Sequence, residues 1–204
     1  MGGPKVVMFE SKIKNENKPS DEDLVRTALA DPEAFGLIID RYNEPLSRYI
    51  RRLTRSDEDE IKDILQDIFI KIYLNLNDFD HSLKFSSWIY RVAHNQVIDN
   101  WRKSQVRPST AIDPDDVFWL TVADDLDLEA DAHRRELGVK IRELIDKLDG
   151  DYRSILILRY LEDKDYREIS DIMKKPIGTV ATLINRAKKK LKNLVEEAVS
   201  IEQE

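Results

Sequence analysis

Residues 163–192 constrain the fold of this chain more than any other stretch, because they have the pattern of two short helices joined by a tight turn. Pro176 cannot continue the first helix, but it suits the first turn of the second. In the second helix, apolar residues recur at helical spacing and are expected to be buried. They are Val180, Ile184, Ala187 and Leu191. The stretch therefore predicts a helix-turn-helix.

The second of these helices carries an unusual concentration of positive charge. From Lys174 to Lys192 there are seven basic residues and no acidic one, whereas the whole chain has a formal net charge of −7. A compact positive face on an acidic protein is typical of a nucleic-acid-binding surface. The side chains predicted to face outward suit contacts with bases and phosphates: Thr179, Thr182, Asn185, Arg186 and Lys189. The alternative is a solvated basic helix that closes a small bundle.

Helical periodicity extends over most of the remaining chain, and no strand is convincing. We therefore expect an all-α protein of two small helical domains joined by an acidic linker. The linker is expected because periodicity fades there and acids accumulate: Asp113, Asp115, Asp116, Asp124, Asp125, Asp127, Glu129, Asp131 and Glu136. The expected division is a disordered segment 1–20, domains 21–104 and 137–198, linker 105–136 and tail 199–204. The expected helices span about 21–30, 31–54, 56–76, a fourth ending near 103, 138–148, 152–161, 165–173 and 177–198.

Several function classes are excluded by what the sequence lacks. There is no cysteine, which excludes disulfides and thiolate metal sites. No glycine-rich phosphate loop or nucleophile elbow is present, and the three histidines, His81, His94 and His133, lack metal-ligand spacing. We therefore expect neither an enzyme nor a cofactor or metal. With no secretory signal and no long apolar run, we expect a cytoplasmic protein without membrane insertion.

The acidic net charge also bears on how the chain would reach DNA. It opposes long-range attraction to DNA, and a single basic helix offers only a few phosphate contacts. One helix-turn-helix without a symmetric partner reads only one half-site. These properties favour a subunit of a larger assembly over a free-standing repressor.

The predicted fourth helix has a second unusual face. Its core stripe is expected at Ile89, Ala93 and Val97. The opposite arc combines a large aromatic with amide, carboxylate and guanidinium groups, which together can stack on an unpaired base and hydrogen-bond its edges. This arc consists of Trp88, Asn95, Asp99 and Arg102, with Arg91 beside it. The alternative, that Trp88 belongs to the core, has equal support.

The predicted third helix has apolar residues on two sides. An ordinary core stripe is formed by Ile61, Ile64, Leu65, Ile68, Ile72 and Leu76. Ile70 and Leu74 lie on the other side, among Asp63, Gln66 and Asp67. Exposed aliphatics beside acids indicate a protein-docking face. A helix packed on both sides is the alternative.

Three motifs together resemble one protein family. DEDEIKDILQDIFIKIY (57–73), KFSSWIYRVAHNQVIDNWRK (84–103) and PIGTVATLINRAKKKL (176–191) occur in the order and spacing of bacterial sigma factors. Over residues 21–197 the chain resembles an extracytoplasmic-function (ECF) sigma factor, the minimal form that has only the second and fourth sigma domains.

The resemblance implies roles and partners for the residues singled out above. The face with Asp63, Gln66, Asp67 and Ile70 would bind the clamp helices of the largest subunit of core RNA polymerase, and the flap of the second-largest subunit is a further implied contact. The arc of the fourth helix, with Phe79 and Lys84 from the preceding loop, would open the promoter −10 element. The five outward residues of the basic helix would read the −35 element. The linker would thread through the polymerase cleft, and an anti-sigma factor is an implied partner.

Two departures from the family pattern concern −35 recognition. Ala181 and Leu183 stand where the family often has basic residues, so fewer phosphate contacts and a weaker salt dependence are expected. Lys174 stands where the turn usually has glycine, and a left-handed conformation there would cost about 1 kcal/mol. The remaining alternatives are a helix-turn-helix regulator with a helical sensor domain, which assigns no role to Trp88, Asn95 and Arg102, and a helical adaptor, which leaves the basic helix unexplained.

Overall fold

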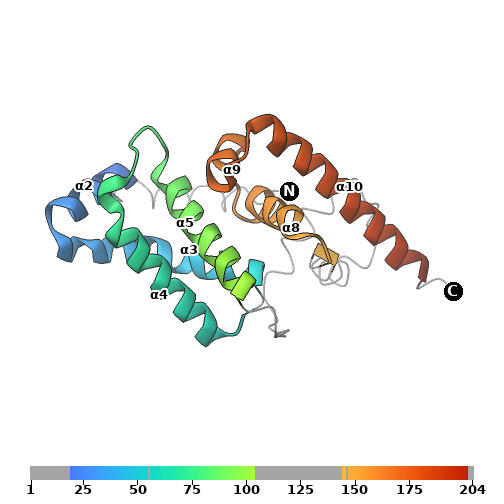
Figure 1. Ribbon diagram of the computed structural model, residues 1–204, viewed down its shortest axis with the longest axis horizontal. Coiled ribbons are helices and arrows are strands. Elements are labelled where there is room, and N and C mark those ends of the chain that lie inside the picture. Colours follow the sequence, from blue (N-terminus) through green and yellow to red (C-terminus); the bar gives the residue numbers. More distant parts are fainter. Residues whose placement is uncertain (1–18, 55, 104–143, 146, 202–204) are drawn as a thin grey trace, which may run out of the picture.

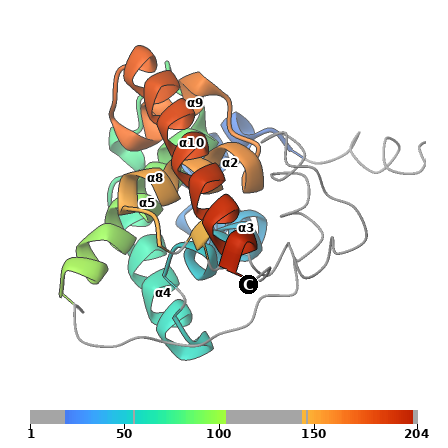
Figure 2. The same cartoon turned by 90° about the vertical axis from the view of Figure 1, so that its right-hand side faces the viewer.

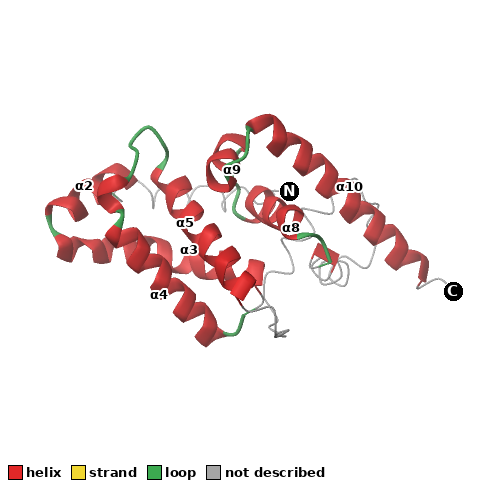
Figure 3. Ribbon diagram, viewed as in Figure 1, coloured by secondary structure: helices red, strands yellow, loops and turns green. Residues whose placement is uncertain are grey.

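The computed structural model describes residues 19–54, 56–103, 144–145 and 147–201 (Figure 1). Every regular element in these ranges is helical, which confirms the all-α class (Figure 3). The elements are α2 (Asp21–Ala30), a 3-10 turn (Pro32–Phe35), α3 (Gly36–Thr54), α4 (Glu58–Leu74), a 3-10 turn (Leu76–Asp78), α5 (Phe85–Lys103), α8 (Gly150–Leu156), a π-helical turn (Ile157–Leu161), α9 (Tyr166–Met173) and α10 (Ile177–Ile201). The predicted acidic linker and most of the predicted helix 138–148 lie outside the described residues.

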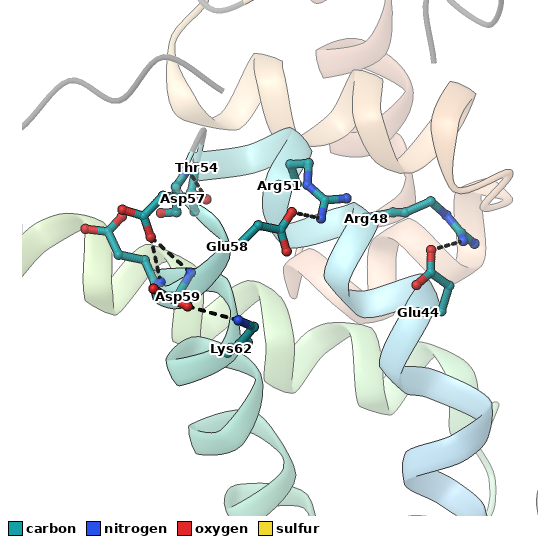
Figure 4. Close-up of polar contacts among 10 residues, drawn as sticks. Glu44, Arg48, Arg51, Thr54, Asp57, Glu58, Asp59 and Lys62 are labelled. Atoms are coloured by element: carbon teal, nitrogen blue, oxygen red, sulfur yellow. Dashed lines mark hydrogen bonds and ion pairs between the residues drawn. The ribbon is translucent and has the colours of Figure 1, made fainter. Parts of the chain in front are cut away.

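Helix starts are set by polar caps. The Ser20 hydroxyl accepts a hydrogen bond from the Asp23 amide, and the Asp23 carboxylate accepts one from the Ser20 amide, so Ser20, the last residue of the segment predicted for 1–20, caps α2. Asp57 accepts from the amides of Asp59 and Glu60 at the start of α4 (Figure 4). At its other end the chain stays helical to Ile201, past the predicted boundary at 198.

Helices α2 to α5 form an N-terminal unit. The stripe predicted for α4 is entirely buried, and it packs with the buried stripe of α5, Ile89, Ala93 and Val97. The end of α3 is joined to the start of α4 by an ion pair of 2.6 Å between Arg51 and Glu58 (Figure 4). This three-helix core fixes which faces of α4 and α5 remain outside.

Helices α8 to α10 form the C-terminal unit, with α9 and α10 as the helix-turn-helix. The apolar residues predicted for the second helix are all buried, against Ile169 and Ile172 of α9 among others. Lys174 ends α9 in a left-handed conformation, with φ 51° and ψ 44°. The predicted strain at the turn is therefore present, and the helix pair forms despite it.

The two units pack against each other, with α9 beside α5 (Figures 1 and 2). A buried polar cluster lies at this junction. Arg52 of α3 pairs with Glu162 at 2.8 Å, and the Tyr90 hydroxyl of α5 donates to the other Glu162 oxygen at 2.7 Å. Arg153 of α8 donates to the carbonyl of Leu53 at 3.3 Å. Buried polar groups from the two units therefore pair with one another across this junction.

Candidate nucleic-acid and protein interfaces

The outward face of α10 is built as the sequence predicts. Thr179, Thr182, Asn185, Arg186 and Lys189 are all exposed, and steps of three or four residues keep them on one side of the helix. The Thr182 hydroxyl donates to the carbonyl of Gly178 at 2.9 Å, so its oxygen is left to accept from a partner. The structure thus presents a continuous polar face with a guanidinium and an ammonium group.

Not all of the basic charge near α10 is directed outward. Lys190 pairs with Asp149 at 2.8 Å and lies over the Tyr152 ring, and Lys175 pairs with Asp151 at 3.0 Å. These lysines attach α10 and the turn before it to α8. The seven basic residues counted in the sequence therefore overstate the charge available for phosphate contacts.

The arc predicted on α5 is only partly exposed. Asn95 and Asp99 lie at the surface and Arg91 is half-buried. Trp88 is 7% exposed, with its ring stacked on Phe85 at 5.7 Å and 5.5 Å from Phe79. Trp88 is therefore a core residue, as the alternative interpretation predicted, because the loop before α5 places Phe79 against the indole. Arg102 lies in the last turn of α5, and its side chain is outside the described atoms.

Lys84, predicted from the resemblance to contact DNA, is engaged within the chain. Its ammonium lies 3.3 Å from Glu168 and 3.6 Å from Asp165, both at the start of α9. The charge of Glu168, with a smaller effect from Asp165, raises the pKa of Lys84. Lys84 and Asp165 are largely exposed, so their contact is weak, whereas the Glu168 side chain is only 12% exposed.

The second face of α4 is exposed, as a docking face requires. Ile70 is 49% and Leu74 is 69% exposed, and Asp63, Gln66 and Asp67 are at the surface beside them. The alternative of a helix packed on both sides is therefore wrong. Sequence reasoning missed Tyr73, which is 47% exposed and whose ring meets Phe35 edge-on. Its spacing of three residues from Ile70 was the available signal.

His94 is a packing residue rather than a surface one. It is buried between α3 and α5, where its Nδ1 lies 3.1 Å from the hydroxyl of Tyr49. Burial lowers the pKa of His94 to about 4, so the ring is neutral at pH 7. Within the described ranges, no three His, Cys, Asp or Glu side chains are grouped so that they could hold a metal ion. None of the helices described has the length and apolar character to span a membrane.

Comparisons with known proteins agree on one family. The models of Sigma-70 region 2 and Sigma-70, region 4 match residues 38–107 and 138–191. The chain is 32% identical over 198 residues to the ECF RNA polymerase sigma factor SigW of Bacillus subtilis, covering 94% of this chain and 98% of SigW. It is 30% identical over 187 residues to the ECF RNA polymerase sigma-E factor of Escherichia coli K12, covering 88% and 96%.

Two solved structures share the fold. CnrH, in complex with the cytosolic domain of CnrY, has a TM-score of 0.63 at 23% identity, covering 88% of this chain and 99% of CnrH. The sigma factor RpoE of Bartonella quintana, in complex with the anti-sigma factor NepR, has a TM-score of 0.58 at 19% identity, covering 79% and 96%. At these identities the likeness concerns the arrangement of helices alone.

Proposed function

From the membership of this chain in the ECF sigma factors, which are DNA-binding transcription initiation factors, we propose that it binds core RNA polymerase through α4, reads the −35 element through α10 and helps to open the −10 element through α5. The observation that carries the proposal is the position of three faces, of which those on α4 and α10 are exposed and the one on α5 is partly exposed. Each lies on a helix that the family comparison matches, and each has the chemistry its role needs.

The α10 face is suited to the major groove of duplex DNA. Hydroxyl, amide and guanidinium groups occupy one side of an exposed helix, and such groups hydrogen-bond base edges. Lys189, one turn further along, suits a phosphate. The departure at Ala181 and Leu183 leaves few cations on this face, so we infer modest −35 affinity that polymerase must supplement.

The α5 face is suited to single-stranded DNA, with Asn95 as its central group. Its amide is exposed and can hydrogen-bond the edge of an unpaired base. Arg91 lies one helical turn before Asn95 and can contact a phosphate of the same strand. Because Trp88 and Phe79 are buried, we infer that stacking on Trp88 requires the 79–84 loop to move. Base capture would therefore be coupled to a rearrangement of this loop.

The packing of the two units conflicts with simultaneous contact to both promoter elements. The centres of the −35 and −10 elements are about 25 base pairs apart, which is roughly 85 Å of B-DNA. In this structure α9, the first helix of the −35 reader, lies against α5, the −10 reader. We infer that the two units separate when the chain binds polymerase.

We also propose an anti-sigma factor as a partner and the cytoplasm as the place of action. CnrH and the Bartonella RpoE were both solved with partner proteins, the latter with an anti-sigma factor. Since this chain has the same fold, a partner that masks the α4 face would compete with polymerase. Competition between core polymerase and a captured partner protein would test this.

The direct test of the proposed function is transcription in vitro. Core RNA polymerase alone and core polymerase with the chain are compared on a promoter library, with start sites mapped by sequencing. We expect new start sites preceded by a common pair of elements, and we expect the chain to copurify with core polymerase. Tight duplex binding in the absence of core, without copurification, would favour a free-standing regulator instead.

A further inference from the structure

Gln96 is a buried polar residue between α4 and α5 that the surfaces described above do not include. It is 5% exposed, although it neighbours the exposed Asn95. A buried amide is costly unless its donors and acceptor are satisfied. Its surroundings therefore show what holds it in place.

The amide of Gln96 is satisfied by three side chains on the two helices. Its Nε2 donates to Asp67 Oδ2 at 2.9 Å and to Asn100 Oδ1 at 3.4 Å. Its Oε1 accepts from the ammonium of Lys71. Two of these partners, Asp67 and Lys71, lie one turn apart on α4.

The arrangement determines what Asp67 can offer at the surface. An Asp and a Lys four residues apart on a helix ordinarily attract each other directly. Here Gln96 lies between them, and among the residues described no ion pair joins Asp67 to Lys71. The carboxylate is held through Oδ2, and Asp67 itself is exposed on the docking face with Gln66 and Ile70. A carboxylate with a fixed orientation loses less conformational freedom when a partner binds it.

We propose that Gln96 is a positioning residue for polymerase binding, which orients the Asp67 carboxylate and separates it from Lys71. The inference rests on the proposed function, in which the α4 face contacts core polymerase. It adds a buried residue of α5 to the determinants of docking. The affinity for polymerase then depends partly on a residue of α5, the helix that also carries Asn95.

The test is a double-mutant cycle on binding of the full chain to core RNA polymerase, with unfolding measured in parallel. The single variants are Asp67→Ala, Gln96→Leu and Gln96→Glu, and the double variant is Asp67→Ala/Gln96→Leu. We expect Gln96→Leu to weaken binding about ten- to a hundredfold, as the loss of a hydrogen bond to a charged group implies. Gln96→Glu should weaken it more, because a second carboxylate then faces Asp67. In the Asp67→Ala background, Gln96→Leu should have no further effect.

Ser87→Ala is the matched control, since it removes another buried polar group of α5, and it should leave the affinity unchanged. If Asp67→Ala binds polymerase normally, the proposed docking face is wrong. If Asp67→Ala weakens binding while Gln96→Leu does not, the docking face stands and the positioning role is overturned. Additive losses in the double variant would also overturn it, because they would show that Gln96 acts through stability rather than through Asp67.

Discussion

Arg52 and Glu162, 110 positions apart in the sequence, form an ion pair of 2.8 Å in which the two side chains are only 7% and 6% exposed. Arg52 also donates to the carbonyl of Leu161 at 3.1 Å, and Tyr90 donates to Glu162. Removing one partner of a buried pair leaves the other charge uncompensated, at a cost of about 3–5 kcal/mol. This contact therefore ties the N-terminal unit to the C-terminal unit.

Breaking the pair should open the free chain. Because the chain has no cysteine, fluorescent labels can be attached at Glu33→Cys and Glu197→Cys, two exposed positions on the two units. We expect Glu162→Gln to lower energy transfer between the labels, since the buried Arg52 then lacks its counter-ion. Glu44→Gln is the control, because it breaks an exposed pair of 2.9 Å with Arg48 on the same helix as Arg52 (Figure 4). It should leave the transfer unchanged.

The same labels test whether the units separate on polymerase. Adding core polymerase to the unmutated labelled chain should lower energy transfer, and Glu162→Gln should bind core more tightly because part of the opening is already done. Unchanged transfer in a complex that demonstrably forms would show that the closed arrangement persists on polymerase.

His94 predicts a pH dependence of stability. Its pKa is about 4 in the folded chain, because of burial, against 6.5 for an exposed histidine. Between these values the unfolded chain binds a proton that the folded chain does not. The free energy of unfolding should therefore fall as the pH decreases from 6.5 to 4, by about 3 kcal/mol from this group. Urea denaturation at several pH values in this range gives the free energy of unfolding as a function of pH. This free energy should depend less steeply on pH for His94→Gln than for His81→Gln, in which the lost histidine is exposed in a loop. Equal slopes would contradict the assignment.

Local periodicity was sufficient to predict most of this fold. The buried stripes of α4 and α10 follow from apolar residues three and four positions apart, and the exposed face of α10 is their complement. Periodicity says nothing about which helices meet. The pairing of Arg52 with Glu162 and of Gln96 with Asp67 joins residues on different helices, and no local pattern marks them.

Trp88 shows a different limit. Its position opposite the core stripe of α5 left exposure and burial equally open, and the structure has it buried because Phe79 from the preceding loop covers it. Helical spacing predicts which side of a helix a residue lies on, but it does not predict which residues of a neighbouring loop will cover that side. The π-helical turn over Ile157–Leu161, which carries the chain to Glu162, was likewise not predicted.

The docking face of α4 predicts a loss of polymerase binding without a loss of fold. Ile70→Glu should abolish copurification with core polymerase, because it places a charge in an apolar contact, and it should change the melting temperature little, since Ile70 is half exposed. Leu29→Glu is the control, with a 40% exposed leucine on α2. If both variants copurify equally well with core polymerase, α4 does not form the contact.

Arg186 predicts base preference at the −35 element. If it pairs with a base, Arg186→Ala should cost about 1–3 kcal/mol and change which −35 sequences the polymerase complex prefers in a selection from a random library. Lys190→Ala removes the same charge from α10 at a position paired with Asp149, and it should leave the preference intact. A uniform loss over all sequences would make Arg186 a phosphate contact, and no loss would remove it from the interface.

Asn95 predicts a defect in strand opening that spares recruitment. Unpairing and unstacking bases costs a few kcal/mol, which the protein recovers by holding a flipped base. Asn95 is the exposed amide on α5, so Asn95→Ala should form closed complexes normally but melt duplex promoters poorly. Reduced permanganate reactivity of thymines near the start site would measure this.

A template with a pre-melted bubble separates strand opening from every earlier step. Because the opening cost is already met in such a template, it should restore transcription by Asn95→Ala, whereas Ile70→Glu, defective in polymerase binding, should stay inactive on it. If the bubble template restores transcription by Asn95→Ala but not by Ile70→Glu, then Asn95 acts after polymerase recruitment and before RNA synthesis. If Asn95→Ala opens duplex promoters as well as the unmutated chain, or if the bubble fails to restore a defective variant, this face of α5 is not where the strands are held apart.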